Sequence, residues 1–181
     1  MNLFTLGHGT APAQELAELI HRSGIEAIVD VRSIPRSRRH PQFSSEEMAV
    51  WVPQLAQCSY RWNQPLGGFR SARADSANVA LRHSSFRGYA DHMESAQFEE
   101  ALNALLHDAS ARRTAVLCSE SLWWRCHRRL ISDAALLLHN IPVFHLFRDG
   151  KLAAHLPTQG VRVLDRRRLR YDLTDDDDSE R

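Results

Sequence analysis

The chain of 181 residues is 43% hydrophobic and 25% charged, which fits one soluble globular domain with a core. Its net charge of +1 argues neither for nor against a nucleic-acid partner, although Lys151 is the only lysine and the other basic residues are arginines, the better bidentate partners for anions. No apolar run approaches the roughly 18 residues that span a membrane. An odd count of three cysteines and the lack of a predicted signal peptide argue against a disulfide framework, so we expect a cytoplasmic protein with free thiols.

The first segments predict a strand, a helix and a second strand. Residues 3–6 form a short apolar run, and Pro12 is suited to the first turn of a helix that Gly24 would end. Residues 27–31 are short and apolar, as a buried parallel strand should be. A right-handed crossover between the two strands is the simplest topology.

A basic loop, residues 32–41, precedes the next predicted helix. Ser44 and Glu47 form a capping box at its start, and Pro53 is expected to kink the helix or end it early. Residues 58–62 are predicted to form a third strand.

The middle of the chain is less regular. Residues 63–88 show no clear periodicity and predict a long loop of the kind that acts as a lid or binding loop, with a short helix near residues 79–82. Helical structure is expected again over residues 86–93, and Ser95 is predicted to cap a further helix.

The second half predicts a strand at residues 115–118, a helix ending at His139, a strand at residues 143–147 and a small edge strand at residues 161–164. Helices that alternate with apolar strands indicate an α/β fold. We therefore expect a single three-layer, Rossmann-like domain, with a mainly parallel sheet of about five strands flanked by helices.

The chain divides into three parts of different character. Residues 1–150 hold the predicted α/β domain, and residues 151–174 are expected to pack on it as a C-terminal extension. Residues 175–181 form an acidic tail that we expect to be disordered.

Chemically reactive residues follow three of the predicted strands. His8 ends the first, Asp30 and Arg32 end the second, and Cys118 and Glu120 end the fourth. Because parallel strands end at one edge of a sheet, where α/β proteins bind ligands, these five side chains are predicted to meet in one site.

The same residues resemble a known family. The pattern combines Gly7-His8, Asp30-Val31-Arg32 with Pro35 and Ser37, Tyr60, Leu66-Gly67-Gly68, Phe86 with Tyr89-Ala90, Leu117-Cys118-x-Glu120 and Cys126-His127-Arg128. From about Leu3 to Leu146 the chain resembles the bacterial domain of unknown function 488 family. The resemblance implies a compact α/β domain and brings no established reaction.

The leading hypothesis is an enzyme acting on an anionic, phosphate- or nucleotide-like substrate. Cys118, at a strand end before a helix, is expected to be a thiolate nucleophile; the alternative is a small buried core residue. Glu120, His8 and Asp30 would supply acid and base chemistry. Alternatively, Asp30 pairs structurally with Arg32, and His8 only bonds a neighbouring loop.

Anion binding is assigned to a second set of residues. Arg32 and Arg128 are expected to clamp the anion. Cys126-His127-Arg128 is predicted to begin a helix, and the helix dipole favours a thiolate on Cys126 in its first turn as well. His127 is expected either in the site or in a capping or packing role. The substrate side is completed by the residues that carry the resemblance, namely Ser37, Gly67 and Gly68.

Two alternatives stay open. The first is a zinc tetrahedron of Cys118, Cys126, His127 and His8. Seven residues separate the two cysteines, more than the roughly two to four that separate the cysteines of common zinc motifs. The leading hypothesis includes neither a metal nor another cofactor. The second is a non-catalytic module for nucleic acid or a partner protein. It draws on the arginines of the basic loop and on three tryptophans expected on the same rim, Trp62, Trp123 and Trp124. The sequence leaves the oligomeric state open.

Overall fold

The structure is a computed structural model that describes residues 1–36 and 38–173. Six strands form one sheet in the order β3-β2-β4-β1-β5-β6, and two more form a separate antiparallel hairpin. The sheet strands are β1 (Leu3–Gly7), β2 (Ala27–Asp30), β3 (Ser59–Trp62), β4 (Thr114–Cys118), β5 (Val143–Leu146) and β6 (Leu152–Ala154), and the hairpin strands are β7 (Val161–Asp165) and β8 (Arg168–Tyr171). β6 is antiparallel to β5, and every other pairing in the six-stranded sheet is parallel.

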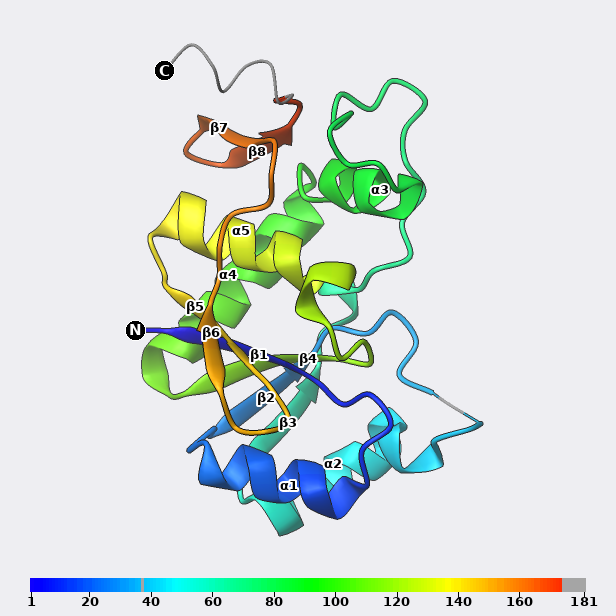
Figure 1. Cartoon of the computed structure of the whole chain (residues 1–181), viewed down its shortest axis with the longest axis vertical. Coiled ribbons are helices and arrows are strands. Elements are labelled where there is room, and N and C mark those ends of the chain that lie inside the picture. Colours follow the sequence, from blue (N-terminus) through cyan, green and yellow to red (C-terminus); the bar gives the residue numbers. More distant parts are fainter. Residues whose placement is uncertain (37, 174–181) are drawn as a thin grey trace.

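Helices cover both faces of the sheet. They are α1 (Ala13–Arg22), α2 (Ser45–Ala56), α3 (Ser84–His92), α4 (Ala96–Ala111) and α5 (Arg128–His139), joined by short 3-10 turns at Pro41–Phe43, Gln64–Leu66 and Trp123–Arg125. Figure 1 shows α1 and α2 on one side of the strands and α4 and α5 on the other. The predicted three-layer α/β class is therefore confirmed, with six strands in the sheet instead of about five.

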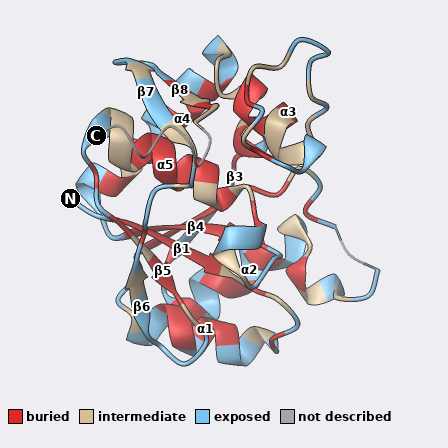
Figure 2. Cartoon of the chain, turned by 45° about the horizontal axis from the view of Figure 1, so that its top comes forward, coloured by how far each residue is buried: buried red, intermediate tan, exposed pale blue. Residues whose placement is uncertain are grey.

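Alternation along the strands explains the layers. Successive strand residues face opposite sides of a sheet, so Leu3 packs with α4 and α5 whereas Phe4 packs with α1 and α2. The central strands have no exposed residue, and Figure 2 shows them buried between the helical layers. Parallel strands covered on both faces are expected to be apolar throughout, as these are.

Two local features differ from those predicted. Pro53 does not end α2, which continues to Ala56; because both Pro53 and Ala49 are exposed, water can bond the Ala49 carbonyl that the proline leaves without an N–H partner. No helix forms near residues 79–82, since the Ala80 N–H donates to the Tyr171 carbonyl of β8 instead of to a local turn.

The C-terminal segment joins the domain at two places. β6 extends the sheet beside β5, and the hairpin β7–β8 buries Leu169 and Tyr171 in the cluster formed with α4 and α5. The expected acidic tail, residues 175–181, lies outside the described residues. No helix in the described part of the chain is long and apolar enough to cross a membrane.

Candidate functional site

A cavity of about 630 Å³ opens where β1, β2 and β4 end. This volume is within the range of about 300–1,000 Å³ usual for small-molecule sites. Four of the five side chains expected to meet line this cavity, namely His8, Arg32, Cys118 and Glu120, whereas Asp30 is fully buried and is not among the lining residues. Arg125, Cys126 and His127, from the segment just before α5, also line the cavity, as does Gly68, which follows the 3-10 turn after β3.

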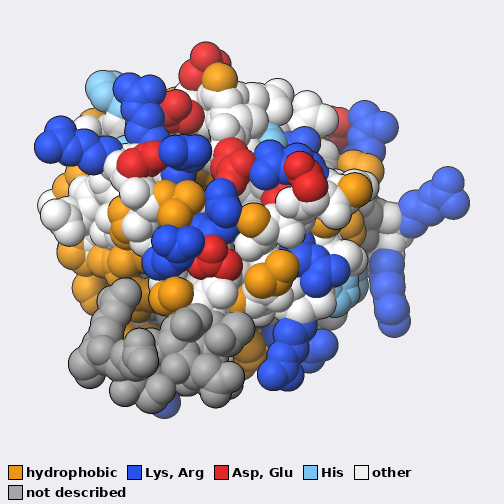
Figure 3. Space-filling model, turned by 90° about the horizontal axis from the view of Figure 1, so that it is seen from above, with side chains coloured by type: hydrophobic (Ala, Val, Ile, Leu, Met, Phe, Trp, Pro, Cys, Tyr) orange, Lys and Arg blue, Asp and Glu red, His pale blue; other side chains and the backbone are white. Residues whose placement is uncertain are grey.

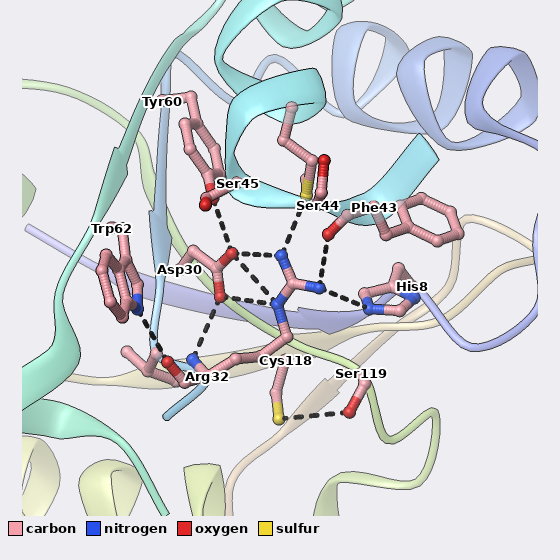
Figure 4. A network of polar contacts seen from close by, with 12 residues as sticks. His8, Asp30, Arg32, Phe43, Ser44, Ser45, Tyr60, Trp62, Cys118 and Ser119 are labelled. Carbon is pink, nitrogen blue, oxygen red and sulfur yellow. Dashed lines mark hydrogen bonds and ion pairs between the residues drawn. The ribbon is translucent and has the colours of Figure 1, made fainter. Parts of the chain in front are cut away.

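Asp30 and Arg32 form a buried ion pair beside the cavity (Figure 4). The Asp30 carboxylate, fully buried, accepts from the Arg32 backbone at 3.0 Å and from the Tyr60 hydroxyl at 2.7 Å. The guanidinium donates to Asp30, to the Phe43 carbonyl at 2.7 Å and to the Met48 sulfur at 3.3 Å. Its donors are thus used inside the protein, which corresponds to the structural alternative rather than to the expected anion clamp.

His8 is enclosed by the same network. Its Nδ1 lies 2.9 Å from the Gly9 carbonyl, its Nε2 lies 3.2 Å from Nη1 of Arg32, and its ring stacks on Phe43. Burial and the Arg32 charge lower the pKa of His8 to about 4. A neutral imidazole with both nitrogens occupied differs from the free general base that the sequence suggested.

The two cysteines of the motif lie together at the floor of the cavity, 6% and 3% exposed for Cys118 and Cys126. A hydrogen bond to Cys126 and burial raise the pKa of Cys118 well above its usual value. Burial alone would raise the pKa of Cys126, but the hydrogen bond from Cys118, the charge of Arg128 and two N–H donors of Arg128 lower it to about 6. The directions of these two pKa shifts favour a thiolate on Cys126 over one on Cys118, whereas the sequence pointed first to Cys118.

The start of α5 holds this sulfur in place. Nε of Arg128 donates to Cys126 Sγ at 3.3 Å, and Nη2 of the same guanidinium donates to the Glu120 carbonyl. Arg128 is 1% exposed, so it stabilises the cavity floor and cannot reach an anion in the opening. Gly7 allows this packing, because a Cβ there would lie 2.0 Å from the Glu120 carbonyl oxygen.

His127 completes the cluster with the two cysteines. Its Nε2 is 2.9 Å from the Val31 carbonyl, which accepts only if Nε2 carries the proton, and its Nδ1 is 3.7 Å from Cys126 Sγ. Burial lowers the pKa of His127, so the ring is neutral. Donor atoms of Cys118, Cys126 and His127 all lie within 4.8 Å of one another, whereas His8 is not part of this group.

Three other predicted site residues, Glu120, Gly67 and Gly68, have different positions relative to the cavity. The Glu120 carboxylate is exposed and accepts from the Leu122 N–H at 3.2 Å, at the cavity rim. Gly67 packs against Ser33 and the Gln64 carbonyl, where a Cβ would come within 2.8 Å of both, and Gly68 faces the His127 ring. Ser37 lies outside the described residues.

The aromatic rim differs from the expected one. None of Trp62, Trp123 and Trp124 is among the described residues that line the cavity. Trp123 stacks on His145 with 3.9 Å between the ring centroids, and the indole N–H of Trp62 donates to the Arg32 carbonyl. Phe69, 89% exposed at the opening, was not predicted from the sequence, where its only signal was its place after the Gly67-Gly68 pair.

The face that carries α3 and the hairpin mixes both signs of charge (Figure 3). Arg168 pairs with Asp165, Arg162 with Asp172, and Arg170 with Glu94. Nucleic-acid-binding surfaces concentrate basic groups instead, so this face gives no support to the polynucleotide alternative.

Comparison with curated proteins and with solved structures finds no match. The model of one family, described as domain of unknown function DUF488, matches residues 12–135. That range includes Asp30, Arg32, both motif cysteines and the start of α5. The chain therefore belongs to the DUF488 family, a domain of unknown function.

Proposed function

We propose that the protein is an enzyme acting on an anionic, phosphate- or nucleotide-like substrate that binds in the cavity. The observation that carries the proposal is the meeting of Cys118, Cys126 and His127 at the floor of one cavity, brought there by the end of β4 and the start of α5. Sulfur and imidazole groups in a partly enclosed pocket are typical of catalytic centres.

The charge of the lining favours an anion. Among the described lining residues three are arginines, and Glu120 is the only carboxylate. Arg32 is occupied by Asp30, so recognition falls to Arg125 and Arg36, which are exposed at the opening. Arg36 is held only loosely, 3.6 Å from Glu46. Phe69 and Phe86 add flat apolar surface on which a nucleobase would stack.

The roles follow from position. Arg125 and Arg36 bind the anionic group, the sulfur and imidazole cluster provides the reactive centre, and Glu120 acts from the rim as acid or base. Asp30, Arg32 and His8 are positioning residues, because their polar atoms bond one another and fix the wall of the cavity.

Binding and turnover test the proposal with a panel of nucleoside phosphates and simple phosphoesters. Calorimetry should detect binding of a phosphorylated compound and not of its uncharged nucleoside. Arg125→Ala should weaken binding about tenfold or more, since a hydrogen bond to a charged group is worth about 1.5–3 kcal/mol. Arg22→Ala, an exposed arginine at the end of α1, is the matched control and should bind like the original chain.

Turnover separates an enzyme from a binding module. Cys126→Ser should retain the fold and abolish product formation. Binding of oligonucleotide with steep salt dependence, with no product and no effect of Cys126→Ser, would instead support the non-catalytic alternative and overturn the proposal.

A further inference from the structure

The cluster at the cavity floor has the donor types of a soft-metal site. Two sulfurs and one imidazole nitrogen lie within 4.8 Å of one another, the one such group of three or more found in the described part of the chain. Thiolate and imidazole together select zinc over magnesium or calcium. In a zinc tetrahedron, bond lengths of about 2.3 Å to sulfur and 2.0–2.1 Å to nitrogen place those atoms about 3.6 Å apart. Cys126 Sγ and His127 Nδ1 are already 3.7 Å apart.

His127 is oriented as metal-binding histidines usually are. Its Nε2–H donates to the Val31 carbonyl at 2.9 Å, which fixes the tautomer and leaves the Nδ1 lone pair directed toward the sulfurs. A backbone carbonyl on the second ring nitrogen is a common outer-shell partner of a metal-binding imidazole. Arg128, 3.3 Å from Cys126 Sγ, would play the same outer-shell role for the thiolate.

Gly68 leaves open the space that an ion needs. A Cβ at this position would lie 2.9 Å from Nδ1 of His127 and 3.3 Å from Cγ of the same ring. The φ angle of Gly68 is not in the left-handed region, so the backbone does not require glycine there. The requirement comes from the room beside Nδ1.

We propose that Cys118, Cys126 and His127 bind one zinc ion through Sγ, Sγ and Nδ1, with a fourth coordination position open to the cavity. All three residues line the cavity, so an exogenous ligand has access to that position. Three protein ligands and one open position are the arrangement of catalytic zinc sites, whereas structural sites use four protein ligands. Two thiolates balance the charge of the ion. The inference rests on the proposed function for the fourth ligand, a water molecule or an anionic oxygen of the substrate.

Metal analysis of the full-length protein tests the inference. Protein prepared without chelator, or titrated with zinc alone, should hold about one zinc per chain. Cys118→Ser, Cys126→Ser and His127→Gln should each weaken zinc binding more than about 100-fold, because even outer-shell changes cost 10- to 100-fold. Cys58→Ser, at the third buried cysteine, should leave it unchanged. Gly68→Ala should weaken it although no ligand is altered.

Alkylation of the unaltered protein gives a second readout that needs no variant. Zinc should protect Cys118 and Cys126 from N-ethylmaleimide, and a chelator should remove that protection. Absence of zinc, zinc that survives Cys118→Ser and His127→Gln together, or equal alkylation with and without zinc would overturn the inference. Nucleoside phosphate binding that depends on Arg125 would still support the proposed function in that case. Zinc without any anion binding would refute the proposed function and retain the metal site.

Discussion

At the scale of single residues, the polar groups around the cavity divide into those that hold the wall and those that face the opening. Asp30 accepts hydrogen bonds from Arg32 and Tyr60 and has no exposed surface. Cys126 and His127 belong to the second group, since they line the cavity with donor atoms directed at each other. Residues of both groups were predicted from the sequence, but which of them hold the wall and which face the opening could not be predicted. Side-chain partners depend on packing rather than on motif spacing.

Asp30→Asn tests the structural part of this division. It leaves the Arg32 charge buried without a carboxylate, and breaking a buried ion pair usually costs about 3–5 kcal/mol. The free energy of unfolding, measured in urea, should fall by about 3 kcal/mol or more. The control, Asp165→Asn, removes an exposed partner of Arg168 on the hairpin and should change little. Equal effects of the two substitutions would contradict the assignment of Asp30 to the wall.

At the scale of elements, helix caps predicted from sequence are present in the structure. The Ser44 side chain accepts from the Glu47 N–H, and that of Ser95 accepts from the Phe98 N–H at 3.2 Å. Such caps can be read from sequence because donor and acceptor are only three residues apart. They fix where α2 and α4 begin, and α4 in turn packs its buried face on the sheet.

Ser95→Ala should destabilise the protein by about 1 kcal/mol, since it leaves an N–H group of the first turn of α4 without its partner. Ser110→Ala, in the last turn of the same helix, provides the control. There the hydroxyl donates only to the His107 carbonyl, and alanine has the higher helix propensity, so stability should be unchanged or slightly higher. Thermal and urea unfolding measure both. A Ser110→Ala loss as large as that of Ser95→Ala would show that the cap is not the cause.

The elements missed from the sequence depend on distant partners. β6 and β8 have only three and four residues, too few for a periodic pattern to identify a strand, and each is defined by a neighbouring strand, β5 or β7. The segment around Ala80 is similarly fixed by β8. By contrast, the core strands β1, β2, β4 and β5 are apolar enough to predict locally, which is why the convergence at the cavity could be predicted.

At the scale of the whole molecule, a buried network of hydrogen-bonded side chains joins the sheet to the C-terminal segment. His145 of β5 bonds Thr5 at 2.8 Å and His155 at 3.0 Å, and His155 bonds Asp133 of α5 at 2.9 Å. Tyr171 of β8 donates to the same carboxylate. Nothing in the sequence pattern indicated this network, since its members are spread over more than 160 residues.

This buried network predicts that the stability of the protein depends on pH. Burial, together with electrostatic interaction with His155 and Arg128, lowers the pKa of His145 to about 3 from an unfolded value of 6.5. Between these values the unfolded state binds the extra proton, so lowering the pH removes up to about 1.4 kcal/mol per pH unit. His145→Phe keeps a ring beside Trp123 but has no imidazole that takes up a proton on unfolding. Its stability deficit, from urea unfolding, should shrink from pH 7 to pH 4. A constant deficit would refute the role assigned to His145.

The most direct test of the whole account is a crystal structure of the zinc-loaded protein with anomalous data at the zinc edge. We predict one peak at the cavity floor, within bonding distance of both motif sulfurs and of Nδ1 of His127, with its free side toward Arg125. A structure in which these three side chains occupy separate surfaces, with no peak between them, would contradict the central claim that β4 and α5 build one reactive centre.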